Sequence, residues 1–165
     1  MSITYGSWTT LTVTNLQSLA SDATDVYSGW KSDVVDNPTA VKADDYEVIF
    51  KLPTTTAAIT GDLAAYVYVL PWMYDGAAWQ PGGNGGTTAA HTTAESTFNI
   101  SDPNAMRGPY PIPIKIAGQV MQGYLQLGQF CRSMPDGWQL AIRQNTGAAF
   151  TTGCSVAYRS INYTS

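Results

Sequence analysis

The chain has 165 residues, of which 44% are hydrophobic and 12% are charged, and its formal net charge is −4. This much apolar material excludes wholesale disorder, and the length fits a single domain over residues 1–165. The eight basic residues are spread along the chain, whereas nucleic-acid binding needs a clustered basic surface. No apolar run is long enough for a membrane-spanning helix. We therefore expect neither a nucleic-acid partner nor a membrane partner.

Apolar and polar residues alternate with a period of two along most of the chain, which predicts half-buried antiparallel strands. The clearest runs cover residues 46–52, 112–116, 124–132, 138–143 and 154–159, whereas residues 64–70 are apolar on both faces and predict a central strand. Trp138 is in phase with the apolar residues of its run, so we expect it in the core. Eight or nine such strands predict an all-β fold, a two-sheet antiparallel β-sandwich resembling a jelly roll.

Prolines and turn residues predict where some of these strands lie in the sheets and how they are connected. Pro111 and Pro113 cannot donate to a strand ladder, so their strand should lie at a sheet edge. Asn145-Thr146-Gly147 has the composition of a tight turn and predicts a hairpin between the last two strands.

Residues 71–93 interrupt the alternation and include a glycine-rich stretch at 82–86. A long segment without regular structure is uncommon in a compact domain and is usually either functional or disordered. This predicted loop carries Trp72, Tyr74 and Trp79. Aromatic side chains are enriched at protein interfaces, so all three are candidate interface residues. The alternatives are packing within the domain, or a platform on which a sugar ring stacks.

The first ten residues precede the strand runs, and we expect residues 1–10 to form a flexible arm. Tyr5 and Trp8 lie in this arm and are candidate interface residues for the same reason. Packing against the protein's own core is the alternative for each.

Motifs for catalysis are missing from the sequence. His91 is the only histidine, and no nucleophile motif accompanies it. The glycines at 82–86 superficially resemble a phosphate-binding loop, but no Lys-Ser or Lys-Thr pair follows them. We therefore expect no enzyme, no catalytic residue and no bound cofactor.

Acidic and sulfur ligands give no strong metal pattern either. Asp33, Asp36, Asp44 and Asp45 flank the turn at Pro38, but their spacing matches no calcium-binding loop, so a solvated turn is favoured. Two cysteines cannot complete a four-ligand zinc site. Cys131 and Cys154 are interpreted as reduced, buried residues, with a disulfide between neighbouring strands as the alternative.

Two segments carry a resemblance. Residues 8–52 contain LAS at 19–21 and DNPT at 36–39, and residues 134–158 contain MPDGW at 134–138 and NTG at 145–147. In this order the segments resemble small virion proteins of tailed bacteriophages, of the jelly-roll capsid decoration or cement type.

This resemblance implies a structural protein, made in the host cytoplasm, that binds the outer surface of the virion capsid and stabilises the shell. The implied partner is the major capsid protein, and the implied assembly is a homotrimer. The arm at residues 1–10 could then add a strand to a neighbour's sheet. Two alternatives stay open: a carbohydrate-binding β-sandwich module, and a neck or tail component of a phage particle.

Overall fold

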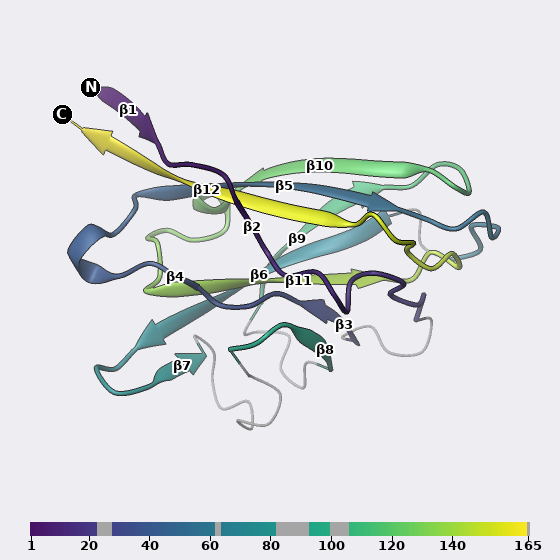
Figure 1. The fold of residues 1–165 in the computed structure, drawn as a ribbon, viewed down its shortest axis with the longest axis horizontal. Helices are drawn as coiled ribbons and strands as arrows, with labels where there is room; N and C mark the ends of the chain where they lie inside the picture. The colour runs from purple at the N-terminus through teal and green to yellow at the C-terminus, as the bar shows by residue number, and fades with distance from the viewer. Residues whose placement is uncertain (23–27, 62–63, 82–92, 100–105, 165) are drawn as a thin grey trace.

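The computed structural model describes residues 1–22, 28–61, 64–81, 93–99 and 106–164. These residues form twelve strands and two short 3₁₀ turns, η1 (Thr39–Val41) and η4 (Leu127–Gln129). The strands make two antiparallel sheets that pack face to face, which confirms the predicted β-sandwich (Figure 1). No described segment forms a helix with the length and hydrophobicity needed to cross a membrane.

The first sheet has five strands. Their order is β1 (Ser2–Tyr5), β12 (Ser155–Thr164), β5 (Asp45–Pro53) and β10 (Val120–Gln126), and the short strand β2 (Thr9–Thr10) also pairs with β12. Alternation along β5 places Val48 and Phe50 in the core and leaves Ile49 on the outer face, where its side chain is 41% exposed.

The second sheet has seven strands. Their order is β7 (Trp79–Pro81), β6 (Ala64–Tyr74), β11 (Gly137–Gln144), β3 (Ser28–Lys31) and β8 (Ser96–Asn99), while β4 (Val35–Asp36) pairs with β11 and β9 (Arg107–Pro113) pairs with β6. Among the described strands β9 pairs only with β6, which confirms the edge position predicted from Pro111 and Pro113.

The core lies between the two sheets and contains the inward residues of both. Trp138 on β11 is fully buried, as predicted. Its ring meets Tyr46 of β5 at a centroid distance of 5.2 Å and Tyr158 of β12 at 5.3 Å, both edge to face. Such aromatic pairs add to the stabilisation from burial. This cluster therefore joins the two sheets at one end of β11.

The predicted hairpin at residues 145–147 is wrong. The strands on either side of it, β11 and β12, belong to different sheets, so the connection crosses from one layer to the other. Gly147 does adopt the positive φ of a turn, at 84°. The buried Thr146 hydroxyl donates to Gln144 Oε1 at 2.7 Å and fixes this crossover instead of a two-strand turn.

The predicted arm and long loop also differ from the structure. Within residues 1–10, β1 pairs antiparallel with β12 of the same chain, from Ser2 opposite Thr164 to Tyr5 opposite Ile161. Residues 71–74 continue β6, and residues 79–81 form β7, which folds back on it. Residues 82–92, which include the glycine-rich stretch and His91, lie outside the described residues.

Both cysteines are free thiols, as predicted, but only Cys154 is buried, whereas Cys131 is half-buried. Cys154 is buried, and its Sγ donates to the Thr151 carbonyl at 3.3 Å. Burial raises the pKa of the Cys154 thiol to about 11. The thiol therefore stays protonated at neutral pH.

Candidate functional site

The five aromatic residues predicted at an interface occupy three different environments. Tyr5 and Trp8 lie together on the outer face of the five-stranded sheet. Tyr74 and Trp79 face one another across the β6–β7 hairpin. Trp72 is buried in the second sheet. The structure therefore divides one predicted set into an exposed pair (Tyr5 and Trp8), a second pair in which Tyr74 is exposed and Trp79 is half-buried, and one core residue.

The interface prediction for Trp72 is wrong, because its side chain is only 1% exposed. Its indole N–H donates to Gln139 Oε1 at 2.7 Å, and the buried Gln139 amide donates in turn to the Ser32 carbonyl at 2.7 Å. The sequence predicts a loop from residue 71 onward, but β6 continues through Pro71 and places Trp72 opposite Gly137 of β11.

The first exposed pair belongs to a surface that we call the aromatic face, formed by Tyr5, Trp8, Glu47, Tyr124 and Arg159. The Arg159 guanidinium lies 4.1 Å from the centroid of the Tyr5 ring and 4.8 Å from that of Trp8. Its Nε also donates to Glu47 Oε2 at 2.5 Å, directly across the β12–β5 ladder. One cation therefore orients both rings.

Tyr124 of β10 extends the aromatic face across the sheet. Its hydroxyl donates to Glu47 Oε1 at 2.9 Å, so Glu47 binds Arg159 and Tyr124 together. Desolvation, followed by the hydrogen bond to Glu47, raises the pKa of Tyr124 to about 12. The hydroxyl therefore remains a donor at neutral pH, and the network is intact there.

The three aromatic side chains of this face are exposed, although each contacts Arg159 or Glu47. Tyr5 is 47% exposed, Trp8 44% and Tyr124 46%. Other apolar residues of β1, β5, β10 and β12 that remain exposed are Ile3, Ile49, Val120 and Tyr163. Glu47 and Arg159 lie in strands that the sequence predicts, but their pairing with the N-terminal rings depends on sheet order and could not be found from the sequence.

The second pair, an exposed Tyr74 and a half-buried Trp79, lies at the β6–β7 hairpin. Tyr74 is directly opposite Trp79, with ring centroids 5.3 Å apart and planes tilted by 56°. Asp75 closes the turn, because its Oδ1 accepts from the backbone N–H groups of Ala77 and Ala78. The hairpin therefore holds the two rings in a defined arrangement.

A hollow of about 540 Å³ lies beside these rings. Its lining comprises Asp36, Asn37, Pro38, Ala40, Tyr74, Trp79 and Asp136. Asp136 Oδ2 accepts from the Tyr74 backbone N–H at 3.1 Å, and Oδ1 pairs with Lys42 Nζ at 3.1 Å. The bond from Tyr74 and then the bond from Lys42 hold the pKa of Asp136 below its usual value. We call this site the acidic aromatic hollow.

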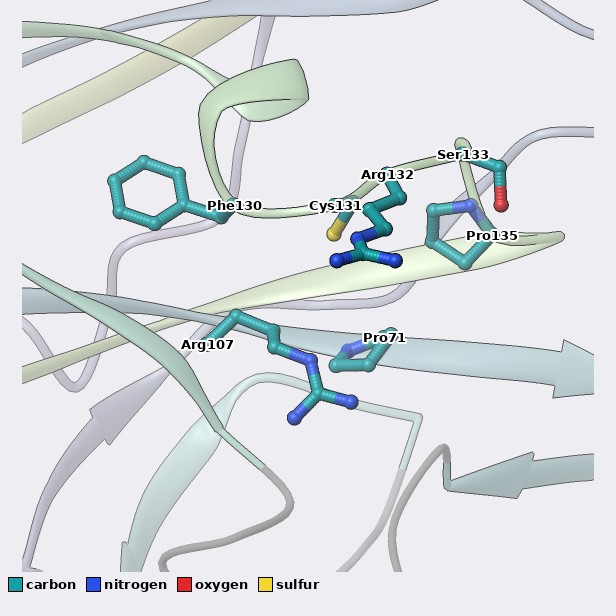
Figure 2. Close-up of a pocket in the computed structure, with 7 residues that line it drawn as sticks. All are labelled: Pro71, Arg107, Phe130, Cys131, Arg132, Ser133 and Pro135. Carbon is teal, nitrogen blue, oxygen red and sulfur yellow. The ribbon is translucent and has the colours of Figure 1, made fainter.

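Another hollow, of about 430 Å³, has a basic lining (Figure 2). Arg107 at the start of β9 and Arg132 in the segment after η4 both line it, together with Cys131. Burial is the main influence on Cys131 and raises the pKa of its thiol, although Arg107 opposes this. The protonated thiol is a poor nucleophile, so this hollow offers no activated cysteine.

Three of the four acidic residues that flank the predicted turn accept hydrogen bonds from backbone groups. Asp33 accepts from the Glu95 N–H, Asp44 from the Tyr163 N–H, and Asp45 from the Tyr46 and Gly128 N–H groups. Within the described part of the chain, no three histidine, cysteine, aspartate or glutamate residues come close enough together to hold a metal ion. These carboxylates therefore tie loops to strands.

No protein-family model matches the chain, and no curated protein matches it either.

Proposed function

We propose that this protein is a non-enzymatic virion structural protein that binds the outer capsid surface and stabilises the shell. The observation that carries the proposal is the aromatic face, in which the Arg159 guanidinium lies over the exposed rings of both Tyr5 and Trp8. The resemblance of residues 8–52 and 134–158 to capsid decoration proteins suggests the major capsid protein as the partner.

The chemistry of the aromatic face suits a protein partner. Trp, Tyr and Arg are the residue types that dominate binding energy at protein interfaces. Here the rings are already oriented by Arg159, and Arg159 is itself fixed by Glu47. Side chains that are ordered before binding lose less conformational entropy on association. The face can therefore bind another protein with little rearrangement.

The low content of charged residues in this protein and the repeating lattice of a capsid both support the same function. With 12% charged residues, the protein has few ions to strip of water when a surface is buried. A capsid presents its subunits in a repeating lattice, so a homotrimer would engage several of them at once. Linked contacts raise the overall affinity well above that of one site. A modest affinity at each aromatic face is then sufficient for the trimer to bind the capsid.

Quantitative mass spectrometry of purified particles from the source virus tests the proposal. The expected result is a copy number on the scale of the major capsid protein, because decoration repeats with the lattice. Absence from the particle would overturn the proposal. A handful of copies would also overturn it and would favour a neck or tail component.

A variant pair tests the role of the aromatic face. Trp8→Ala is expected to weaken binding to undecorated capsids by about tenfold or more, the usual effect of removing an aromatic hot spot. Trp79→Ala, which removes the half-buried indole of the β6–β7 hairpin, should change capsid binding less than about twofold. Equal loss in both variants would show that the aromatic face is not the contact surface.

A further inference from the structure

We propose that the acidic aromatic hollow is a binding site for a neutral saccharide. The inference is independent of the capsid proposal, because the hollow lies at β4, η1 and the β6–β7 hairpin, whereas the aromatic face lies on the other sheet. The inference is based on the lining of the hollow, in which the rings of Tyr74 and Trp79 lie beside the carboxylates of Asp36 and Asp136.

The aromatic wall of the hollow is built in advance of any ligand. A Cβ placed on Gly137 would lie 2.7 Å from Trp79 Cζ3 and 3.0 Å from Val34 Cγ1, so the indole rests on bare backbone. Tyr74 packs against the same indole, and the Asp75 turn fixes the hairpin that carries both rings. A ligand therefore meets rings that need little ordering.

The polar wall supplies hydrogen-bond acceptors. A carboxylate oxygen can accept more than one hydrogen bond, and each Asp136 oxygen accepts only one from a described residue. Asp36 is exposed, and its carboxylate bonds to no side chain or backbone group in the described ranges. The buried side-chain amide of Asn37 is already hydrogen-bonded within the protein, so it forms a rigid part of the wall of the hollow. The hollow thus has acceptors ready for hydroxyl donors.

The combination of aromatic rings and hydrogen-bond acceptors in the hollow favours one class of ligand over others. A pyranose presents an apolar C–H face that can lie on an aromatic ring, and hydroxyl groups that donate to carboxylates. An anionic sugar would be repelled by Asp36 and Asp136. A cation would compete with Lys42, which already pairs with Asp136 at 3.1 Å. The volume of about 540 Å³ falls within the usual range for small-molecule sites. The neutral saccharide satisfies all of these conditions.

Isothermal titration calorimetry with the full chain tests the inference. The probes are neutral hexoses, N-acetylhexosamines and their disaccharides, with glucuronic acid, arginine and choline as charged comparators. At least one neutral saccharide is expected to saturate the protein, and glucuronic acid is not. Saturation by no neutral saccharide in the millimolar range would overturn the inference. Preferential binding of arginine or choline would also overturn it and would indicate a cation site.

Three variants locate the binding. Trp79→Ala and Asp36→Asn are each expected to raise the Kd of the bound saccharide, the former by about tenfold or more. Asp36→Asn alters an exposed side chain, so it tests the site even where Trp79→Ala disturbs the hairpin. Trp8→Ala, in the aromatic face, should leave the Kd within about twofold. Unchanged binding in both Trp79→Ala and Asp36→Asn would place the saccharide elsewhere and overturn the inference.

Discussion

At the scale of single residues, Asn37 shows how one buried amide organises both a loop and a binding wall. Its Oδ1 accepts from the Ala43 N–H at 2.8 Å and from the Tyr46 hydroxyl at 3.0 Å, and its Nδ2 donates to the Pro135 carbonyl at 3.0 Å. Asn37 is fully buried, so these bonds have no competition from water. The amide therefore ties the segment after β4 to β5 and to the start of β11.

We predict that Asn37→Ala lowers the free energy of unfolding by about 2–4 kcal/mol, because it leaves several buried polar groups without this partner. Tyr46→Phe removes only one of the bonds and should cost about 1 kcal/mol. Urea denaturation measures both. Asn162→Ala, which alters a half-buried asparagine in β12, is the matched control, and a loss there as large as that of Asn37→Ala would contradict the prediction.

Lys31 gives a residue-scale prediction about pH. Its side chain is buried, and desolvation lowers its pKa from 10.5 to about 8. Between these values the unfolded state binds more protons than the native state, so stability rises with pH. Tyr46 and Cys154 act in the opposite direction at higher pH, because burial raises their pKa values to about 12 and about 11.

The rise should therefore be visible from about pH 8 to pH 9, above which Cys154 opposes it, with a slope below about 1.4 kcal/mol per pH unit. Chemical denaturation at several pH values measures it. Lys31→Met keeps a long side chain without the charge and should flatten the curve. If the stability of Lys31→Met rises equally with pH, other groups must cause the pH dependence.

At the scale of elements, β1 connects the fold to the proposed function. All four of its residues are exposed, and it forms one edge of the five-stranded sheet through its ladder with β12. The strand also supplies Tyr5, one of the two rings that hold Arg159. Because it buries little apolar surface, β1 contributes more to the aromatic face than to the core.

We predict that deletion of residues 1–6 leaves the sandwich folded, lowers the Tm by a few degrees and weakens capsid binding. It also exposes the edge of β12, so self-association should increase. Circular dichroism melts and light scattering measure these effects. Tyr5→Ala keeps the ladder while removing the ring, and should weaken capsid binding without new self-association. Global unfolding on deletion would show that β1 is part of the folded core.

At the scale of the whole molecule, the two aromatic pairs at the surface lie on different sheets and carry different chemistry. The aromatic face has its rings fixed by an internal ion pair between Arg159 and Glu47. The acidic aromatic hollow instead keeps acceptors open beside its rings. Both can therefore be occupied at once, and a capsid-bound protein could still present its hollow to a glycan.

The sequence by itself determined the fold class, because two-residue alternation is a local property of each strand. It also determined the core position of Trp138 and the edge position of β9, since both follow from phase and from the missing proline N–H. It did not determine how far β6 continues beyond Pro71, and so it misplaced Trp72 in a loop.

Only the tertiary structure decided which exposed residues meet. Arg159 comes from the last strand, Glu47 from the fifth and Tyr5 from the first, and their contact depends on the order β1-β12-β5 within the sheet. Asp136 reaches Tyr74 because β11 pairs with β6 in a register that places Gly137 opposite Trp72. Alternation decides which face a side chain occupies, whereas sheet order and register, which are set by long-range packing, decide its neighbours.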